Sequence, residues 1–442
     1  MRVIPSPSRM IKKPMGRYNK SEEMLQRAML TIPLGAQTFS KSLTQFPRGI
    51  SPFFAERGEG AWLYDVDGNR YADFLNGLAS ITLGYNDPDV NNAVREQLDR
   101  GSIFSLSSCL EFEVAERIVE MVPCAEMVRF GKNGSDATSG AVRLARAYTG
   151  KDYIFICGYH GWHDWYIGAT TKDLGVPKAT KELTKRFDYN DISSLQKLFD
   201  EYKENVAGVI LEPISFDEPK DNFLEQVKEL THQNNAVLIF DEVVSGFRFS
   251  NGGAQEYFGV TPDLATFGKG LANGYPLSAV AGNSEIMKLM ETVFFSFTFG
   301  GETLSLAAAR AVLDKLKSQP VIHKMQGTGQ TILDDVNTMI TEYKFEELIR
   351  IKGLPVWTLI GINEFHGHDA FTWKTLLLQE MFANGVLTIG THNISFSHAE
   401  EHIEQLKYGY RSFFEKVQNI MQGANMKEML HADPLVPLFK VR

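Results

Sequence analysis

The stretch AVLIFDEVVSGFR, residues 236–248, decides the fold class of this chain. Its first five residues are all apolar, which is typical of a strand buried on both faces of a parallel sheet. Further apolar runs at 127–130, 153–157 and 206–211 alternate with segments of helical pattern. This alternation predicts an α/β fold with a mostly parallel sheet covered by helices on both faces.

A carboxylate stands where the first of these strands ends. Asp241 follows the apolar run directly, and ligands of open α/β sheets bind at the carboxyl ends of the strands. A charged hydrogen bond from Asp241 would keep a protonated ring nitrogen cationic and the ring electron-withdrawing. A loop cap or a metal ligand is the alternative for an isolated aspartate at this place.

A lysine lies between two glycines further along the chain, in TFGKGLANGYP at 266–276. Glycine on both sides of Lys269 permits a sharp bend and the close approach of a bulky group. A lysine held there, away from bulk water, loses part of its preference for the charged form. It then becomes an amine nucleophile suited to a Schiff base. The alternative is a surface lysine in a turn.

Two loops complete the set of candidate motifs. GKNGSD at 131–136 separates a strand from a helical pattern, which directs backbone amides and the helix dipole toward an anion. The alternative is an ordinary turn capped by Ser135 or Asp136. GYHGWHD at 158–164 follows another strand, and its aromatic side chains could stack on a planar heterocycle or pack in the core. The paired histidines lack the companion ligands of a metal site, so no metal is expected.

These motifs occur in an order that resembles the class III aminotransferases, which are fold-type I enzymes that use pyridoxal 5′-phosphate (PLP). RGEGAWLYDVDGNRY at 57–71 and LEPI at 211–214 extend the likeness. The similarity is greatest to glutamate-1-semialdehyde aminomutase and its relatives, from about residue 21 to the C-terminus. It implies a large domain with a mostly parallel mixed sheet and a small α+β domain built from both ends of the chain.

The resemblance implies a role for each matching residue around the cofactor ring. Lys269 would hold PLP as a Schiff base and shuttle the proton during turnover. Asp241 would bind the pyridinium nitrogen. Val243 would pack on one face of the ring and Tyr159 would stack on the other. Glu212 matches a glutamate that helps to order the site.

Other matches concern the phosphate and a second subunit. Gly134 and Ser135 would hold the phosphate group. Thr298 matches a threonine that reaches the phosphate from the partner subunit, so the resemblance implies a homodimer with shared active sites. Lys41 and His160 are candidate substrate contacts.

The chain departs from the family pattern at three places. The phosphate loop reads KNGSDA at 132–137 where the family usually has NSGTEA, and Glu302-Thr303 stands where Asn-Pro is usual. Lys41, in QTFSKS at 37–42, replaces an arginine of the aminomutases. Lysine lacks the planar two-point contact that arginine makes with a carboxylate. This version is more similar to relatives that aminate sugars or other polyhydroxylated carbonyl compounds in glycan or secondary-metabolite pathways.

Three functions follow as alternatives. The first is a PLP-dependent aminotransferase that moves an amine from a donor, with glutamate as candidate, to an aldehyde or ketone acceptor. The second is a 2,1-aminomutase of the glutamate-1-semialdehyde type. It is favoured by the polar loop at 168–191, whose GVPK at 175–178 resembles the aminomutase lid but also fits a surface excursion. The third is a non-catalytic binding homologue.

Composition limits the classes of binding partner, and the sequence pattern predicts the domain organisation. The 442 residues carry a net charge of −9, which argues against nucleic acid or an anionic membrane as the main partner. Three cysteines are too few for a disulfide framework, and no apolar run reaches membrane-spanning length, so a cytoplasmic location is expected. We expect a basic N-terminal arm at 1–20 and a large PLP-binding domain at 86–320. The small domain would combine 21–85 and 321–442.

Overall fold

The computed structural model describes residues 16–214 and 217–436. Most of the expected N-terminal arm, residues 1–15, therefore lies outside the described residues. The described chain begins with the 3-10 turn η1 (Gly16–Tyr18) and helix α1 (Asn19–Met29). Tyr18 is buried in a small apolar cluster together with Phe46 and Tyr71, so this end of the chain packs onto the small domain.

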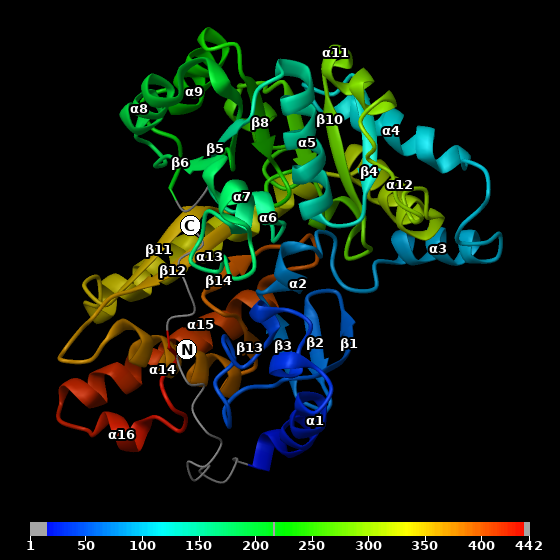
Figure 1. The fold of residues 1–442 in the computed structure, drawn as a ribbon. Coiled ribbons are helices and arrows are strands. Elements are labelled where there is room, and N and C mark those ends of the chain that lie inside the picture. Colours follow the sequence, from blue (N-terminus) through cyan, green and yellow to red (C-terminus); the bar gives the residue numbers. More distant parts are fainter. Residues whose placement is uncertain (1–15, 215–216, 437–442) are drawn as a thin grey trace.

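A seven-stranded sheet forms the centre of the large domain (Figure 1). Its fourth position is held by the strand that ends at Asp241, and the apolar runs expected to be strands are confirmed as strands. All neighbours run parallel except the antiparallel β10, so the predicted mostly parallel α/β sheet is confirmed. In spatial order the strands are β4 (Met127–Gly131), β10 (Ser278–Gly282), β9 (Leu264–Phe267), β8 (Val237–Asp241), β7 (Val206–Leu211), β5 (Tyr153–Cys157) and β6 (Thr184–Arg186).

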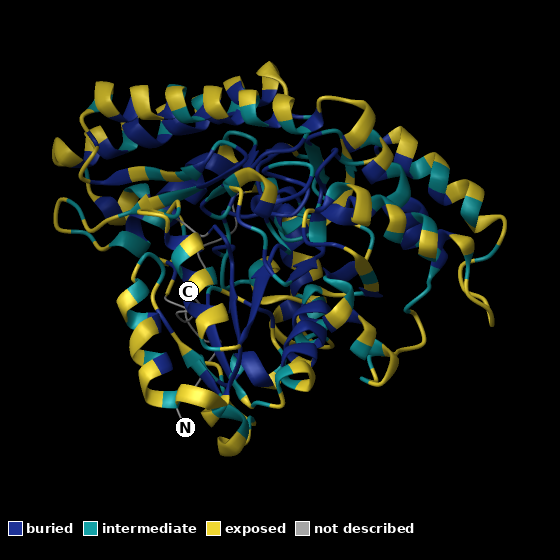
Figure 2. Ribbon diagram, turned by 90° about the horizontal axis from the view of Figure 1, so that it is seen from above, coloured by how far each residue is buried: buried dark blue, intermediate teal, exposed yellow. Residues whose placement is uncertain are grey.

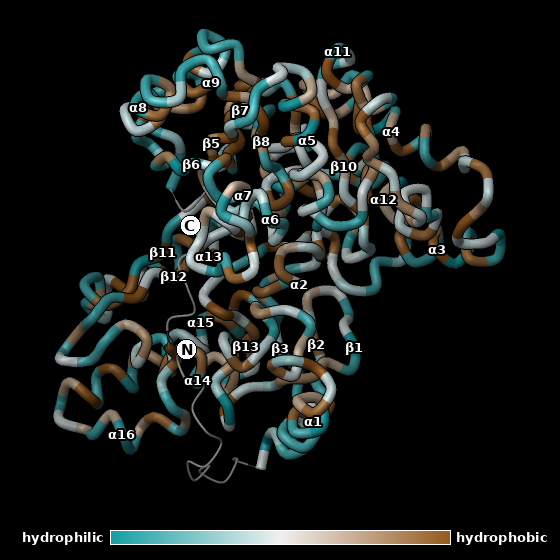
Figure 3. Tube along the Cα trace, viewed as in Figure 1, coloured by the Kyte–Doolittle hydropathy of each residue, from teal (hydrophilic) through white to brown (hydrophobic). Residues whose placement is uncertain are grey.

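Helices cover both faces of this sheet because successive strand side chains point to opposite sides. In β5, Ile154 and Ile156 pack against α5 (Gly134–Thr149), whereas Phe155 and Cys157 pack against α8 (Ile192–Tyr202). Figure 2 shows the buried strands between helices whose outer faces are exposed, and Figure 3 shows hydrophobic strands beneath largely hydrophilic outer helices. The other helices of this part are α3 (Pro88–Leu98), α4 (Cys109–Met121), α6 (Asp164–Ile167), α9 (Phe223–Gln233), α10 (Ala254–Phe258), α11 (Ser284–Met287) and α12 (Thr303–Ser318).

The two ends of the chain meet in a second, four-stranded sheet. Its order is β1 (Ala55–Glu59), β2 (Trp62–Asp65), β3 (Arg70–Asp73) and β13 (Val386–Leu387), and β13 pairs with β3 across more than three hundred residues of sequence. The remaining elements are β11 (Ile349–Leu354), β12 (Trp357–Ile362), β14 (Thr391–Asn393), α13 (Val321–Tyr343), α14 (Ala370–Ala383), α15 (Glu400–Met421) and α16 (Met426–Met429). We retain the division at 21–85, 86–320 and 321–442 as a proposal.

A left-handed turn joins the four-stranded sheet to the large domain. In α2 (Asn76–Ala79) four consecutive residues have positive φ, and three of them are not glycine. Such backbone costs about 1–2 kcal/mol per non-glycine residue, so it requires strong clamps. Asp73 accepts hydrogen bonds from the backbone N–H groups of Leu75 and Asn76, both at 2.8 Å.

The side chain of Arg248 is the second clamp on this turn. It is buried and donates to the carbonyl of Ala79 at 2.8 Å and to that of Ile394 at 2.9 Å. Burial lowers the pKa of Arg248 to about 10, which leaves it charged at neutral pH. One residue just after β8 therefore fixes both halves of the small domain.

The expectation of a continuous polar loop at 168–191 is wrong in part. A short helix, α7 (Lys178–Glu182), and the edge strand β6 occupy its second half. Pairing with β5 supplies backbone partners that sequence polarity alone does not reveal. In the first half, the ammonium of Lys172 lies 5.9 Å from the ring centre of Phe39, next to the 3-10 turn η3 (Phe39–Lys41). The other 3-10 turns are η2 (Pro33–Gly35), η4 (Lys203–Asn205), η5 (Lys269–Ala272) and η6 (Lys288–Glu291).

Buried histidines make the stability of the small domain sensitive to acid. His392 contacts the Thr358 hydroxyl at 2.8 Å and the Tyr410 hydroxyl at 3.0 Å, and burial lowers the pKa values of His392 and His398 to about 3. Unfolded histidines take up protons near pH 6.5, whereas these two do so only near pH 3 in the folded protein. We expect the free energy of unfolding to be unaffected by them above pH 6.5 and to fall between pH 6.5 and 3.

The loss is about 1.4 kcal/mol per pH unit for each histidine. Urea unfolding of the wild type and of His392→Gln at pH 7 and pH 5 measures it. The glutamine variant is expected to be less stable at pH 7 but to lose less on acidification. Equal losses in the two proteins would contradict the assignment.

Candidate active site

The carboxylate of Asp241 sits at the end of β8 and is almost fully buried. Its Oδ1 accepts hydrogen bonds from the backbone N–H of Val243 at 3.1 Å and from the hydroxyl of Thr266 at 3.3 Å. Its Oδ2 lies 2.8 Å from Nδ1 of His160, whose side chain is fully buried. Three elements thus fix the orientation of one carboxylate.

Lys269 begins the turn η5 directly after β9 and is half-buried. Its φ of +40° lies in the left-handed region, which side chains other than glycine rarely adopt. Close packing requires glycine at Gly270, whereas at Gly268 an added Cβ atom would make an ordinary van der Waals contact. A Cβ atom added at Gly270 would lie 2.3 Å from the hydroxyl oxygen of Thr82, and one at Gly268 would lie 3.4 Å from Cγ1 of Val243. Strained backbone of this kind gathers at functional sites.

Val243 brings the three central motifs together. A Cβ atom added at Gly134 would lie 2.9 Å from Cγ1 of Val243, and one at Gly268 would lie 3.8 Å from Cα of Gly134. The glycine-rich loop, the end of β8 and the lysine turn are therefore in mutual contact. The sequence suggested these segments separately, and the structure places them at one point.

The glycine-rich loop starts α5 in the way that an anion site requires. Oδ2 of Asp136 accepts hydrogen bonds from the backbone N–H groups of Lys132 at 3.1 Å and Asn133 at 2.7 Å. The N-cap residue of this 16-residue helix is Asn133, and Asp136 completes a capping box from the third helical position, so neither Ser135 nor Asp136 is itself the N-cap. The hydroxyl of Ser135 accepts a hydrogen bond from the backbone N–H of Trp162 at 3.2 Å, which joins this loop to the aromatic loop.

Glu212 orders the aromatic loop from the end of β7. Its Oε2 accepts a hydrogen bond from the backbone N–H of Tyr159 at 2.9 Å. A Cβ atom added at Gly158 would lie 2.6 Å from the same oxygen, so only glycine permits this approach. The ring of Tyr159 is 37% exposed, whereas its neighbour His160 points inward to Asp241.

The geometry changes the interpretation of His160. The side chain is fully buried, and its Nδ1 lies 2.8 Å from Oδ2 of Asp241. We therefore infer that His160 positions Asp241, and its role as a substrate contact stays a prediction. The sequence of the aromatic loop predicted a stacking surface but not the contact between His160 and Asp241, because no local pattern links the two residues.

Lys41 and Thr298 are both exposed in the single chain. Lys41 is exposed at the end of η3, and Thr298 is exposed in the segment between η6 and α12. Phe294 and Phe299 of that segment are 80% and 57% exposed. Their roles stay predictions.

Comparison with known proteins gives the family. The model for "Aminotransferase class-III" matches residues 46–403. A 3-aminobutyryl-CoA aminotransferase from Cloacimonas acidaminovorans is 38% identical over 73% of this chain and 79% of its own length. A glutamate-1-semialdehyde 2,1-aminomutase from Methanosarcina acetivorans is 33% identical over 89% of this chain and 97% of its own length.

A solved structure agrees on the fold. The FumI protein of Sphingopyxis sp. MTA144 in its PLP internal aldimine form superposes with a TM-score of 0.85, at 24% identity, over 93% of this chain and 99% of that chain. The chain belongs to the class III aminotransferase family, whose members are PLP-dependent enzymes of fold type I. The suspected family, the fold and the cofactor are confirmed.

The residues present fit PLP. A half-buried lysine on strained backbone, an oriented carboxylate and a glycine-rich helix start lie around Val243. They match the amine, the ring-nitrogen partner and the anion cradle that the cofactor requires.

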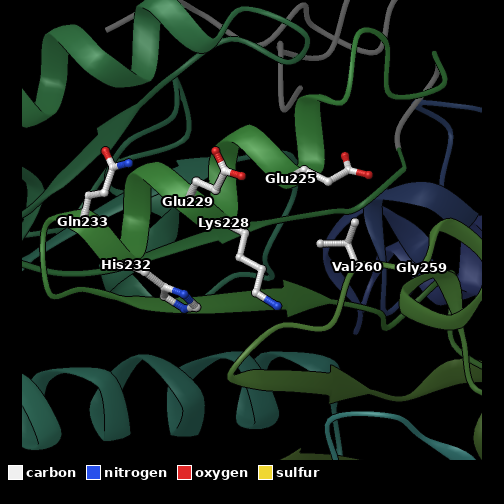
Figure 4. A pocket seen from close by; sticks show the side chains of 7 residues that line it. All are labelled: Glu225, Lys228, Glu229, His232, Gln233, Gly259 and Val260. Atoms are coloured by element: carbon white, nitrogen blue, oxygen red, sulfur yellow. The ribbon is translucent and has the colours of Figure 1, made fainter.

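A surface hollow of about 420 Å³ lies against α9 (Figure 4), and none of the candidate site residues lines it. No group of three or more histidine, cysteine, aspartate or glutamate side chains in the described ranges could hold a metal ion. Among the helices that the structure describes, none is long and apolar enough to cross a membrane.

The contact at Val243 predicts a steric test. Gly134→Ala would force its methyl group against a branched side chain with little freedom. Overpacking of this kind costs about 1–3 kcal/mol, so we expect PLP to bind the apo-protein about tenfold more weakly. Titration of the apo-protein with PLP, followed by absorbance, measures this affinity.

Two variants serve as controls. Val243→Ala added to Gly134→Ala should recover part of the affinity, because it removes the clashing methyl groups. Gly327→Ala in α13 has no atom within 4 Å of the added Cβ and should leave PLP binding unchanged. Full affinity in Gly134→Ala alone would mean that the loop does not depend on this contact.

Proposed function

We propose that this enzyme is an aminotransferase that takes an amine from a small-molecule donor, with glutamate as candidate, and gives it to an aldehyde or ketone acceptor. The observation that carries the proposal is the contact of the Lys269 turn, the Asp241 strand end and the Gly134 loop around Val243. When bound, PLP supplies an electron-withdrawing ring that stabilises negative charge on the substrate carbon. The protein supplies binding, orientation and proton transfer.

Each residue has a task in this proposal. Lys269 binds the cofactor through Nζ and, when released, moves a proton at the same atom. Asp241 holds the ring nitrogen in its charged form, and His160 holds Asp241. Val243 and Tyr159 cover the two faces of the ring. Gly134 and Ser135 bind the phosphate group, and Glu212 keeps Tyr159 in place.

The identity of the acceptor rests on the substrate side of the site. Lys41 offers one cation without the planar fork of arginine, which supports a sugar or polyol-like carbonyl compound in glycan or secondary-metabolite biosynthesis. One relative is called a 3-aminobutyryl-CoA aminotransferase, and that name supports transfer between two molecules. A glutamate-1-semialdehyde-type aminomutase is the second candidate, because several relatives have that name. A non-catalytic homologue does not explain the strained Lys269.

A homodimer with shared active sites belongs to the same proposal. Thr298 lies in a segment with exposed phenylalanines at 294 and 299, and apolar side chains of this size favour burial against a partner. Thr298 would then reach the phosphate bound by the partner subunit.

Light absorption tests the proposed reaction directly. The purified enzyme is expected to be yellow, to lose this absorption when L-glutamate is added and to release 2-oxoglutarate. Lys269→Ala should abolish turnover, since no other amine stands at this place in the motif. A yellow enzyme that ignores glutamate would favour the aminomutase or another donor. A colourless protein that cannot be loaded with PLP would refute the proposal.

The role of Asp241 predicts that its removal lowers catalytic turnover but leaves PLP binding largely intact. Asp241→Ala should still bind PLP through Lys269, but turnover should fall by about 10²-fold or more, as expected for the loss of an electrostatic partner of the reacting group. His160→Gln is a matched variant that keeps a hydrogen-bonding side chain beside the carboxylate. It should cause a smaller loss, measured as kcat for the half-reaction with the donor. Full activity in Asp241→Ala would exclude its ring-nitrogen role.

A further inference from the structure

Two of the departures from the family pattern lie in contact with each other. Nζ of Lys132, in the glycine-rich loop, lies 2.9 Å from Oε2 of Glu302 and 3.4 Å from the hydroxyl of Ser305. The side chains of Lys132 and Glu302 are only 15% and 17% exposed. An ion pair this far from water is screened much less than a surface pair, so each charge depends on the other.

Glu302 is held in its charged form on the other side of the pair. Its carboxylate accepts hydrogen bonds from the backbone N–H of Leu304 at 2.8 Å and from the hydroxyl of Ser305 at 2.6 Å, so it caps α12. Burial alone would raise the pKa of Glu302, but the hydrogen bonds from Ser305 and Lys132 outweigh it and lower the pKa. Glu302 is therefore negatively charged at neutral pH.

Lys132 also belongs to the cap of α5. Its backbone N–H donates to Asp136 at 3.1 Å, while its side chain reaches Glu302. One residue thus joins the capped starts of two helices, and one of these starts is the proposed phosphate cradle. The side chain of Lys132 is directed to Glu302.

The segment between η6 and α12 is fixed at its other end to β4 and α5, the two elements that flank the glycine-rich loop. Arg129 donates to the carbonyl of Phe295 at 3.4 Å, and Arg143 donates to that of Phe294 at 3.3 Å. The ring of Phe295 fills the space beside Gly140, where an added Cβ atom would lie 3.0 Å from it. The Lys132–Glu302 pair is the corresponding attachment at the α12 end.

Thr303 explains why the usual proline is absent here. Its backbone N–H donates to the carbonyl of Ser102 at 2.9 Å, and its hydroxyl donates to the carbonyl of Gly101 at 2.8 Å. Proline has neither donor. The start of α12 is thus anchored on a third segment, which makes Glu302 a fixed point against which Lys132 can be held.

We propose that Lys132 and Glu302 form a positioning pair that sets the affinity of the enzyme for the phosphate group of its cofactor. The inference rests on the proposed role of Gly134 and Ser135 as the phosphate site. Breaking the pair leaves a charge with little access to water and no opposite charge beside it, which is costly. The glycine-rich loop relieves this cost by moving, and its backbone amides then no longer converge on the phosphate.

A double-mutant cycle on the apo-enzyme tests the proposal. Lys132→Met keeps the length of the side chain without its charge, and Glu302→Gln removes the charge but keeps one acceptor oxygen for the α12 cap. Each variant, and the double variant, is titrated with PLP and with pyridoxal, which lacks the phosphate. We expect each single change to weaken PLP binding about tenfold and to leave pyridoxal binding unchanged. The double variant should bind PLP no more weakly than the single variant with the lower affinity, because the effects of substitutions at coupled residues are not additive.

Other outcomes would overturn the proposal. If Lys132 bound the phosphate directly, Lys132→Met would weaken PLP binding but Glu302→Gln would not. If the pair only stabilised the fold, the apo-variants would melt at lower temperature with an unchanged ratio of PLP to pyridoxal affinity. Lys317→Met, which removes an exposed ion pair with Glu120 at the far end of α12, is the control and should change neither affinity. Wild-type apo-protein that failed to bind PLP would instead refute the proposed function.

Discussion

The contact of Val243 with Gly134 and Gly268 is the constraint on which the rest of the site depends. No larger residue fits at Gly134, because its Cβ atom would approach Val243 to 2.9 Å. Three loops that follow three different strands are thereby held at one point. Parallel strands bring their carboxyl ends to one edge of the sheet. This arrangement alone would still let the loops that follow the strands shift by several ångströms relative to one another. The steric contact removes that freedom, and hydrogen bonds such as His160 to Asp241 then fix the side chains.

The segment after β8 divides its residues among three structural tasks. Asp241 faces the candidate site. Glu242 is buried and accepts hydrogen bonds from the hydroxyl of Ser245 at 3.0 Å and from the side chain of Gln255 at 2.9 Å, which ties the following loop to the sheet. Arg248 clamps the left-handed turn of the small domain. A single short motif thus connects the candidate site to the contact between the two domains. We expect a change in any of the three residues to alter the geometry of the site.

Much of the fold could be predicted from the sequence because its signals are local. The buried strands at β5, β7 and β8 are continuous apolar runs, and α12 has apolar residues at helical spacing. The same reasoning failed for α7 and β6. Their sequence is polar and short, and their structure depends on pairing with β5. Tertiary contacts override weak local preferences in such segments.

The sequence by itself determined the α/β class, the family and the set of motifs that meet at Val243, since residue type, spacing and order carry that information. Only the tertiary structure decided which side chains face one another. His160 lies against Asp241, 81 residues away, and Lys132 pairs with Glu302, 170 residues away. Reading the chain alone assigned His160 to the substrate and left Lys132 as an unexplained departure. The physical reason is that hydrogen bonds and ion pairs depend on distances of about 3 Å, which local periodicity does not encode.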